Sequence, residues 1–527
     1  MAGSGTSSSR SPSPERGPAA PSAEQALLRA GQALCERPEA LRELGALLEA
    51  AELRGSAGSA ALARLAAALG GLAAPPRREQ DGAEPPGREA ALAAVAERAE
   101  RVGAAFLLLL QKLEDARSQQ SPVGPIPKRV LGHAFIFAVA HKEERPWTTA
   151  RSRAVAQELL ERLVRTAGCG SVEEFLQGKE GDEEGAFGEV MGLLKQELTK
   201  DTWKRNPASK DVFSWSLLRV SRPWLCPHLE RVLPPALLLS DDFQEENKVL
   251  GVRCLHHIVL NVPGADLCQF NRAQVVFHAL YNHLYSREAP LIQAVLLCLL
   301  DLLPVLERCQ RRQGQARATS PWDQVLQLLL THMEPEHRLA LRRVYAGTLP
   351  AFVSRLGILI VRHMKRLERV ILGYLEVSDG PGEEARLGIL QTLQCTIEHA
   401  WPRIPCRLPV LLKALLRLLW DVHTASGARP PSPSGLPCCT RPPSASSCWT
   451  AAARARSRCC WQGCTAAVRR SGCRSASGRC RRAPDAAQPL LYNKIVVFIS
   501  NSVVLVPPVS PYTRQRGQGH LGLCPPS

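Results

Sequence analysis

The chain has 527 residues, of which 45% are apolar and only 5% aromatic. A single compact core seldom grows to this length, so the sequence encodes several domains or an elongated array. A core made mainly of Leu, Ala and Val favours helices, because sheets are normally richer in Tyr, Phe, Ile and Thr. The net charge of +17 would suit a nucleic-acid-binding protein. However, residues 428–527 hold 14 Lys and Arg against one acidic residue, whereas residues 1–427 hold 52 against 48. The nearly neutral main body argues against a phosphate-binding surface there.

The 18 cysteines divide at the same point, nine before residue 428 and nine after it. Cys254, Cys298 and Cys395 stand in apolar stretches, where a free cysteine acts as a small hydrophobic residue. The N-terminus lacks the apolar run of a secretory signal, so we expect free thiols in a reducing compartment. The apolar run Leu291–Leu300 is followed by Asp301 and is shorter than the about 20 residues of a membrane span. We therefore expect a soluble chain.

In chain order, residues 1–22 are rich in Ser, Gly and Pro, a composition typical of disorder. Residues 23–116 form an N-terminal helical region. Within it, a linker rich in Pro, Glu, Arg and Gly at 75–87 separates two or three Ala- and Leu-rich helices from a further helix that ends near Ala116.

Residues 123–427 contain about a dozen helical segments, separated by short breakers such as Pro263-Gly264 and Pro321. The breakers recur about every 15 to 25 residues, one helix apart. Helices of that length with short connections pack against their sequence neighbours. Repeated over 300 residues, this arrangement predicts an all-α array of stacked helix pairs, a solenoid of the HEAT or armadillo kind.

Two segments illustrate the helical pattern. Asp241–Leu260 begins with Asp241 and Gln244 at the spacing of a capping box. Pro350–Leu375 begins with proline, which is favoured at the first helical position. In the second segment, one face carries a stripe of apolar residues at three- and four-residue steps: Val353, Leu356, Ile360, Met364, Leu367, Ile371 and Tyr374.

Residues 428–527 form a basic tail rich in Cys, Arg and Pro, for which we expect disorder because helical periodicity stops after Val422. Gly517, Gly519 and Gly522 match the dinucleotide-binding spacing, but the chain ends before a helix could follow. The eight cysteines between Cys438 and Cys480 lack the paired CxxC motifs of a structural zinc site. We expect no catalytic residues, no cofactor and no bound metal.

One surface feature stands out in the Pro350–Leu375 segment. A row of arginines steps by seven, four and three residues, which places them on the face opposite the apolar stripe. Such a row is usually a solvated helix face. The alternative is a docking stripe for an acidic partner, because guanidinium groups pair bidentately with carboxylates. The residues of this candidate protein-binding stripe are Arg355, Arg362, Lys365, Arg366 and Arg369.

Two long stretches resemble a known family. The first runs from Ser240-Asp241-Asp242-Phe243-Gln244-Glu245-Glu246-Asn247-Lys248 to Val262, and the second from Met333-Glu334-Pro335-Glu336-His337-Arg338 to Gly380-Pro381. They are similar to the Tel-Two-Interacting Protein Two family, the smallest subunit of the Triple-T co-chaperone complex. The similarity spans about residues 200–427, and more loosely 120–427. The family continues with further helices where this chain departs from the pattern, after about residue 424.

The resemblance implies a HEAT-like scaffold in the cytoplasm and nucleus. Its partners would be the Tel-Two protein and Tel-Two-interacting protein One. With the ninety-kilodalton heat-shock chaperone system, that complex matures and stabilises phosphatidylinositol-three-kinase-related kinases such as mTOR, ATM and ATR. These kinases act in the DNA-damage response, telomere maintenance and growth signalling. Two alternatives remain open: a basic nucleic-acid-associated protein that acts through its tail, and a transport-type helical adaptor that carries cargo.

Overall fold

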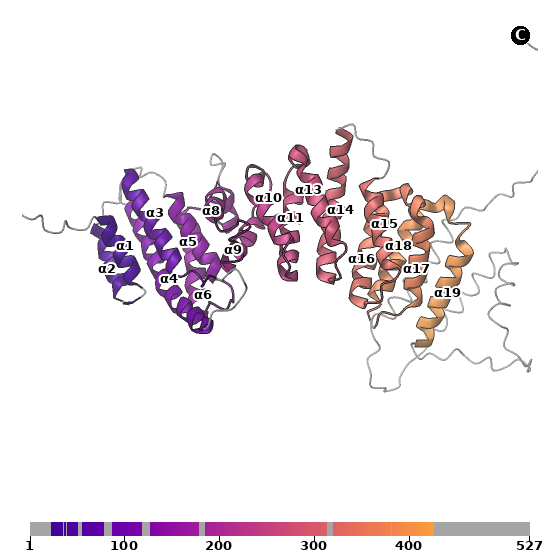
Figure 1. Ribbon diagram of the computed structural model, residues 1–527, viewed down its shortest axis with the longest axis horizontal. Coiled ribbons are helices and arrows are strands. Elements are labelled where there is room, and N and C mark those ends of the chain that lie inside the picture. The colour runs from indigo at the N-terminus through magenta and orange to yellow at the C-terminus, as the bar shows by residue number, and fades with distance from the viewer. Residues whose placement is uncertain are drawn as a thin grey trace, which may run out of the picture. The chain divides into compact units, whose positions relative to one another are not determined.

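The computed structural model describes residues 23–34, 36–37, 39–50, 55–77, 87–118, 127–178, 185–312, 320–380 and 382–425 (Figure 1). The regions expected to be disordered, residues 1–22 and 428–527, lie outside these ranges. The chain divides into two compact units. Unit 1 comprises residues 1–280 and 304–309, and unit 2 comprises residues 281–303 and 310–527. The domain boundaries drawn from the sequence stay a prediction.

Every regular element in the described ranges is helical, which confirms the all-α fold class. The α-helices are α1 (Ala23–Ala33), α2 (Ala40–Ala50), α3 (Gly55–Leu72), α4 (Arg88–Ser118), α5 (Lys128–His141), α6 (Ala150–Thr166), α7 (Val172–Gln177), α8 (Phe187–Leu194), α9 (Pro207–Leu217), α10 (Leu229–Ser240), α11 (Glu245–Asn261), α12 (Gly264–Cys268), α13 (Arg272–His283), α14 (Ala289–Arg312), α15 (Pro321–Met333), α16 (Leu339–Leu356), α17 (Met364–Glu376), α18 (Glu384–Ala400) and α19 (Leu408–Ala425). The 3-10 turns are η1 (Cys226–His228), η2 (Gln269–Asn271), η3 (Gly357–His363) and η4 (Trp401–Arg403).

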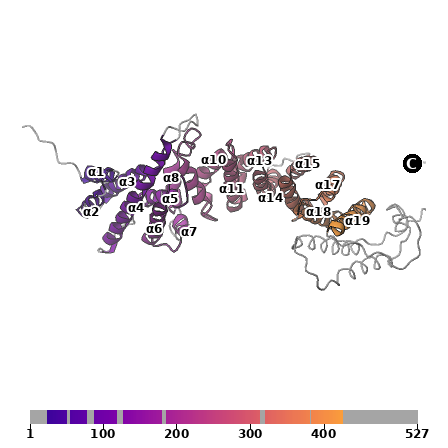
Figure 2. The ribbon, with the colours of Figure 1, turned by 90° about the horizontal axis from the view of Figure 1, so that it is seen from below.

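The helices stack in two rows, the arrangement expected of HEAT-like repeats. In unit 1, α1 contacts α3 and α3 contacts α5, while α2 contacts α4 and α4 contacts α6. Unit 2 repeats this order: α15, α17 and α19 form one row, and α16 and α18 form the other. Figure 2 shows α19 following α17 and α18 at the end of the stack. In α1–α6 and α15–α19, helices contact both a sequence neighbour and the helix two positions away, which is how a solenoid buries a continuous core.

Leu, Val and Ala dominate that core, as the composition predicted. Glycine allows a close crossing of α16 and α18 in unit 2. A Cβ at Gly388 would lie 2.5 Å from the carbonyl oxygen of Ala346, closer than van der Waals contact permits. Gly251 has the same role in unit 1, where a Cβ would collide with the backbone of Ser240. Helices can approach this closely only where no side chain separates their backbones.

Two sequence expectations fail within unit 1. The helix predicted from Asp241 begins instead at Glu245, and the side chain of Gln244 makes no capping bond. The neighbouring carboxylate of Asp242 bonds instead to Lys204 and Asn247, as described below. Cys268 and Cys309 form a disulfide with Cα atoms 5.3 Å apart, although free thiols were expected. Their pairing is set by the packing of α12 against the α14 segment of unit 1, which no local pattern reveals. Cys254, Cys298 and Cys395 are free thiols, as predicted; the first two are buried and Cys395 is half-buried.

By length and composition alone, two apolar stretches could cross a membrane: Ala289–Arg312 and Leu339–Glu376. Core helices of soluble proteins pass the same test. The second stretch is interrupted by η3, and its apolar residues pack on α15 and α18. Half or more of each apolar window is buried within the fold, 56% for the first stretch and 50% for the second.

Candidate protein-binding surface

The arginine stripe does not lie on one helix, so the helix predicted over Pro350–Leu375 is wrong. Gly357 adopts a φ of +56°, a conformation that residues with a Cβ disfavour, and it ends α16. The chain then makes the 3-10 turn η3 before α17 begins, and Pro350 lies inside α16 rather than at a helix start. The stripe is therefore divided among three elements, with Arg355 in α16, Arg362 in η3, and Lys365, Arg366 and Arg369 in α17.

Three of the arginines pair with acidic residues of α15 and the residue that follows it. Arg362 donates to the Oδ2 atom of Asp323 over 3.1 Å. The Nε atom of Arg366 lies 3.6 Å from Oε1 of Glu334, and Nη1 of Arg369 lies 4.0 Å from the same oxygen. These acidic residues are 30 to 40 positions away in the sequence, so the helical pattern could not disclose them. The stripe thus braces α17 against α15.

The stripe nevertheless remains accessible. The side chains of Arg362 and Arg369 are 61% and 60% exposed despite their ion pairs. Arg355 and Lys365 are also exposed. Exposed ion pairs typically contribute only about 0–1 kcal/mol, so a partner's carboxylates could compete for these groups at little cost. Whether the stripe binds a partner stays a prediction.

Two apolar side chains lie within the stripe and were missed from the sequence. Ile358 is 67% exposed and Leu359 42%, both in η3. The sequence pattern predicted one continuous helix over Pro350–Leu375, so it gave no sign of the turn η3 that contains these two exposed side chains. Arginine beside exposed apolar groups is a composition found at the centres of protein interfaces. We refer to the following residues as the α16–α17 surface: Arg355, Ile358, Leu359, Arg362, Lys365, Arg366 and Arg369.

The α16–α17 surface rests on a packed support. Leu356, Ile360 and Leu367 are buried, which confirms the predicted apolar stripe on the opposite side. Behind it, Glu368 is buried and accepts a hydrogen bond of 2.6 Å from Arg407, in the connection between η4 and α19. Packing and this ion pair fix the orientation of α17, so the exposed side chains project from a rigid base.

The far end of α17 is held by a second buried polar cluster. Asp379 is fully buried; it accepts from Nε of Arg343 over 3.3 Å and from the backbone of Ala385 over 2.9 Å. Arg342 stacks on Tyr374, 3.8 Å from the ring centre. Burial raises the pKa of the Tyr374 hydroxyl. These bonds fix the turn that leads from α17 to α18.

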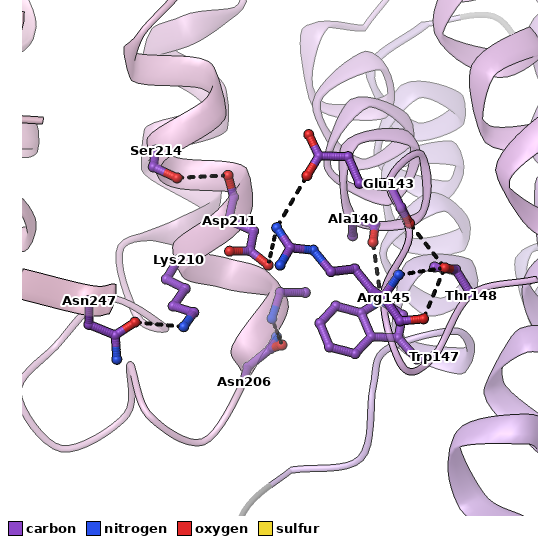
Figure 3. Close-up of polar contacts among 11 residues, drawn as sticks. Ala140, Glu143, Arg145, Trp147, Thr148, Asn206, Lys210, Asp211, Ser214 and Asn247 are labelled. Carbon is purple, nitrogen blue, oxygen red and sulfur yellow. Dashed lines mark hydrogen bonds and ion pairs between the residues drawn. The ribbon is translucent and has the colours of Figure 1, made fainter. Parts of the chain in front are cut away.

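In unit 1, the connections between helices carry another polar network (Figure 3). Arg145 follows α5. Its Nη2 atom lies 3.2 Å from Oε2 of the nearby Glu143 and 3.2 Å from Oδ2 of Asp211 in α9. The indole nitrogen of Trp147 donates to the carbonyl of Ala140 over 3.1 Å. Burial raises the pKa of Asp211, although Arg145 opposes that shift. The network fastens the connection after α5 to α9.

The network continues to the connection between α10 and α11. Lys210 donates to Asn247 over 2.7 Å, and Asn247 donates to the buried carboxylate of Asp242 over 2.6 Å (Figure 3 shows the first bond). Lys204 pairs with Asp242 over 2.7 Å. Burial raises the pKa of Asp242, but these hydrogen bonds outweigh burial and hold the pKa below its ordinary value. Phe243 is left 76% exposed, with Lys204 4.8 Å from its ring centre. Because these polar groups bond to one another, their evident role is to hold successive helix pairs together.

The region that contains these features matches known proteins. The model of the Tti2 family matches residues 135–381. TELO2-interacting protein 2 of Homo sapiens is 55% identical over 408 residues, which cover 74% of this chain and 78% of that protein. The chain belongs to the Tti2 family. TELO2-interacting protein 2 of Rattus norvegicus is also 55% identical, over 73% of this chain and 76% of the rat protein. The family resemblance drawn from the sequence is thereby confirmed.

A solved structure of Kap95p with RanGDP is also similar to this chain. The identity is 14% and the TM-score 0.39, over 74% of this chain and 46% of that protein. This likeness is too distant to bear on function. The unit 1 network and the α16–α17 surface both lie within the residues matched by the family model. Family membership and an all-helical solenoid are together what a scaffold protein would have.

Proposed function

We propose that this chain is a non-catalytic scaffold subunit of a Triple-T-like co-chaperone complex. Its partners would be the Tel-Two protein and Tel-Two-interacting protein One, in the cytoplasm and nucleus. The observation that supports this most is the 55% identity to TELO2-interacting protein 2 over about three quarters of both chains. That relative is named for its interaction with TELO2, and the proposal extends the same interaction to this chain.

The fold supports a binding role through the distribution of its polar groups. In a helical array, one side of each helix is packed and the other is available to partners. The α16–α17 surface combines cations with exposed Ile358 and Leu359 on a rigid base. A complementary partner surface would offer carboxylates around an apolar patch, because guanidinium groups pair bidentately with carboxylates. We expect that surface to belong to a sister subunit.

The downstream function would be the maturation of phosphatidylinositol-three-kinase-related kinases, through the ninety-kilodalton heat-shock chaperone system. Depletion of this protein should lower the steady-state levels of mTOR, ATM and ATR together without changing their transcripts. Re-expression of the full chain should restore them. Quantitative mass spectrometry with transcript measurement in the same cells provides the test. Unchanged kinase levels after complete depletion would defeat the proposal.

The tail offers a different class of function, because its excess of basic residues would suit nucleic acid. Deletion of residues 428–527 separates the two. A scaffold should still recover the sister subunits, whereas a nucleic-acid-associated protein should lose its salt-dependent binding to DNA or RNA. A transport-type adaptor would instead co-purify with cargo and with a nucleotide-dependent release factor. Mass spectrometry of the proteins recovered with the full chain distinguishes that case.

A further inference from the structure

The last described helix, α19, has two rows of apolar residues instead of one. Leu411, Leu415, Leu418 and Val422 are buried at steps of four, three and four, and α19 contacts α17. A second row lies beside the first, at steps of four residues: Leu408, Leu412, Leu416 and Trp420. Its members Leu416 and Trp420 are 44% and 61% exposed.

The second row is unusual for an outer helix face in this unit. The exposed positions of α18 include Gln391, Gln394 and Glu398, and those of α17 include Lys365 and Arg369. The apolar arc of α19 is wider than one packing contact requires, and a helix that is apolar over most of its surface is normally covered on more than one side. The second row is as apolar as the first but more exposed, so it has the composition of a face that another segment covers.

The sequence beyond α19 contains one segment suited to cover it. Leu490–Val506 is bounded by Pro489 and Pro507, and 12 of its 17 residues are apolar. Lys494 is its single charged residue. By contrast, residues 426–489 contain only four large apolar side chains, Leu436, Trp449, Trp461 and Val468. An apolar segment with a single charge suits an apolar row without charged members, and docking would remove the apolar side chains of both from water.

The chain length between the two favours contact within one molecule. Residues 426–489 form a connection of 64 residues, whose root-mean-square span as a flexible chain is about 44 Å. The helix α19, with 18 residues, is about 27 Å long, so the connection can reach any point on it. A tethered segment has an effective concentration on the order of millimolar, well above that of a separate partner in a cell. We propose that Leu490–Val506 docks on the second apolar row of α19 in the same chain.

Site-specific photocrosslinking in the full chain tests this contact. A benzoylphenylalanine at position 416 should crosslink to residues 490–506 of the same molecule, and one at the exposed position of Gln391 should not. A mixture of isotopically light and heavy chains distinguishes contacts within one molecule from contacts between copies. Crosslinks to a heavy copy, to a co-purified subunit, or to no part of 490–506 would each overturn the proposal.

Substitutions supply a second measurement that does not depend on crosslinking. Ile495→Asp with Phe498→Asp should abolish the position 416 crosslink and increase amide hydrogen exchange in α19 about tenfold. The matched change Val509→Asp with Leu521→Asp, in the same tail outside the segment, should do neither. Unaltered exchange in the Ile495/Phe498 variant would contradict docking. Neither measurement involves kinase levels or sister subunits, so failure of this docking proposal would leave the proposed function untouched, and the reverse also holds.

Discussion

The two units use their helix connections differently. In unit 1, charged residues pair across successive helix pairs: Arg145 pairs with Asp211, and Lys204 pairs with Asp242. In unit 2, the connection η3 exposes Ile358 and Leu359, and the side chains of Arg362 and Arg369 remain 61% and 60% exposed. The sequence pattern predicted neither η3 nor the connection that holds Asp242: the residues of η3 were expected within one long helix, and Asp242 within the first turn of another. From this comparison we expect a charged connection to bind a partner only where its groups stay largely exposed, as Arg362 and Arg369 do despite their ion pairs.

If this distinction holds, changes in the core or in the internal bonds should alter stability, while changes on the α16–α17 surface should alter binding alone. The largest effect should come from the support of that surface. Leu367→Asp strands a carboxylate at a fully buried position of α17, and should destabilise unit 2 by about 4 kcal/mol or more.

Thermal melting and hydrogen exchange would measure this loss, with accelerated exchange across α15–α19. The control is Ile358→Asp, at a side chain that is 67% exposed, which should change stability by less than about 0.5 kcal/mol. Equal destabilisation by both variants would show that η3 is part of the core rather than a surface.

The disulfide of unit 1 should give the next largest effect. Cys268 and Cys309 are 41 residues apart in sequence, and closing a loop of that length stabilises a protein by at most about 4 kcal/mol in the chain-entropy account. The double variant Cys268→Ser/Cys309→Ser should therefore melt at a lower temperature than the unaltered chain. The difference should vanish when both are melted in reductant. A difference that persists in reductant would assign the loss to packing instead.

A buried histidine of unit 1 should make stability depend on pH. Nε2 of His141 donates to the carbonyl of Ala73 over 3.0 Å, and burial lowers the pKa of His141 to about 4. Its pKa in the unfolded chain is about 6.5. Between these values the unfolded chain binds a proton that the folded chain excludes, so stability is lost as the pH falls from 6.5 toward 4. The loss should approach about 3 kcal/mol.

Denaturant unfolding at several pH values measures that slope. His141→Gln removes the titrating group while keeping a donor for Ala73, and should flatten the curve between pH 6.5 and 4. The same slope in both proteins would mean that other groups dominate the acid sensitivity of unit 1.

The smallest effect on stability, and a clear one on binding, should come from the α16–α17 surface. Arg355→Glu with Lys365→Glu reverses two exposed charges, and should change stability by less than about 0.5 kcal/mol. If the surface meets carboxylates, the affinity for the sister subunits should fall about tenfold or more, since like charges across an interface repel. Arg362 and Arg366 are poorer choices, because glutamates there would face Asp323 and Glu334.

Quantitative pull-downs of the sister subunits, beside a melt of each variant, separate binding from folding. Arg151→Glu with Lys200→Glu makes the same charge change at exposed positions of unit 1, and should leave recovery intact. Equal recovery of all variants would return the stripe to an ordinary solvated face that braces α15.

Much of this protein was determined by its sequence alone. Three- and four-residue apolar spacing is a local property, so it predicted the all-helical class and the buried positions Leu356, Ile360 and Leu367. The long ungapped stretches beginning at Ser240 and Met333 predicted the family. Both inferences need only the order of residues along the chain.

Only the tertiary structure decided which groups meet. Gly357 ends α16 within an otherwise continuous helical pattern, because its backbone enters a region of φ that the apolar spacing does not encode. Asp323 reaches Arg362, and Cys309 reaches Cys268, across about 40 residues of chain. Such pairings depend on how the helices stack. The same type of charged or apolar residue can therefore form internal contacts in one unit and lie on an exposed surface in the other.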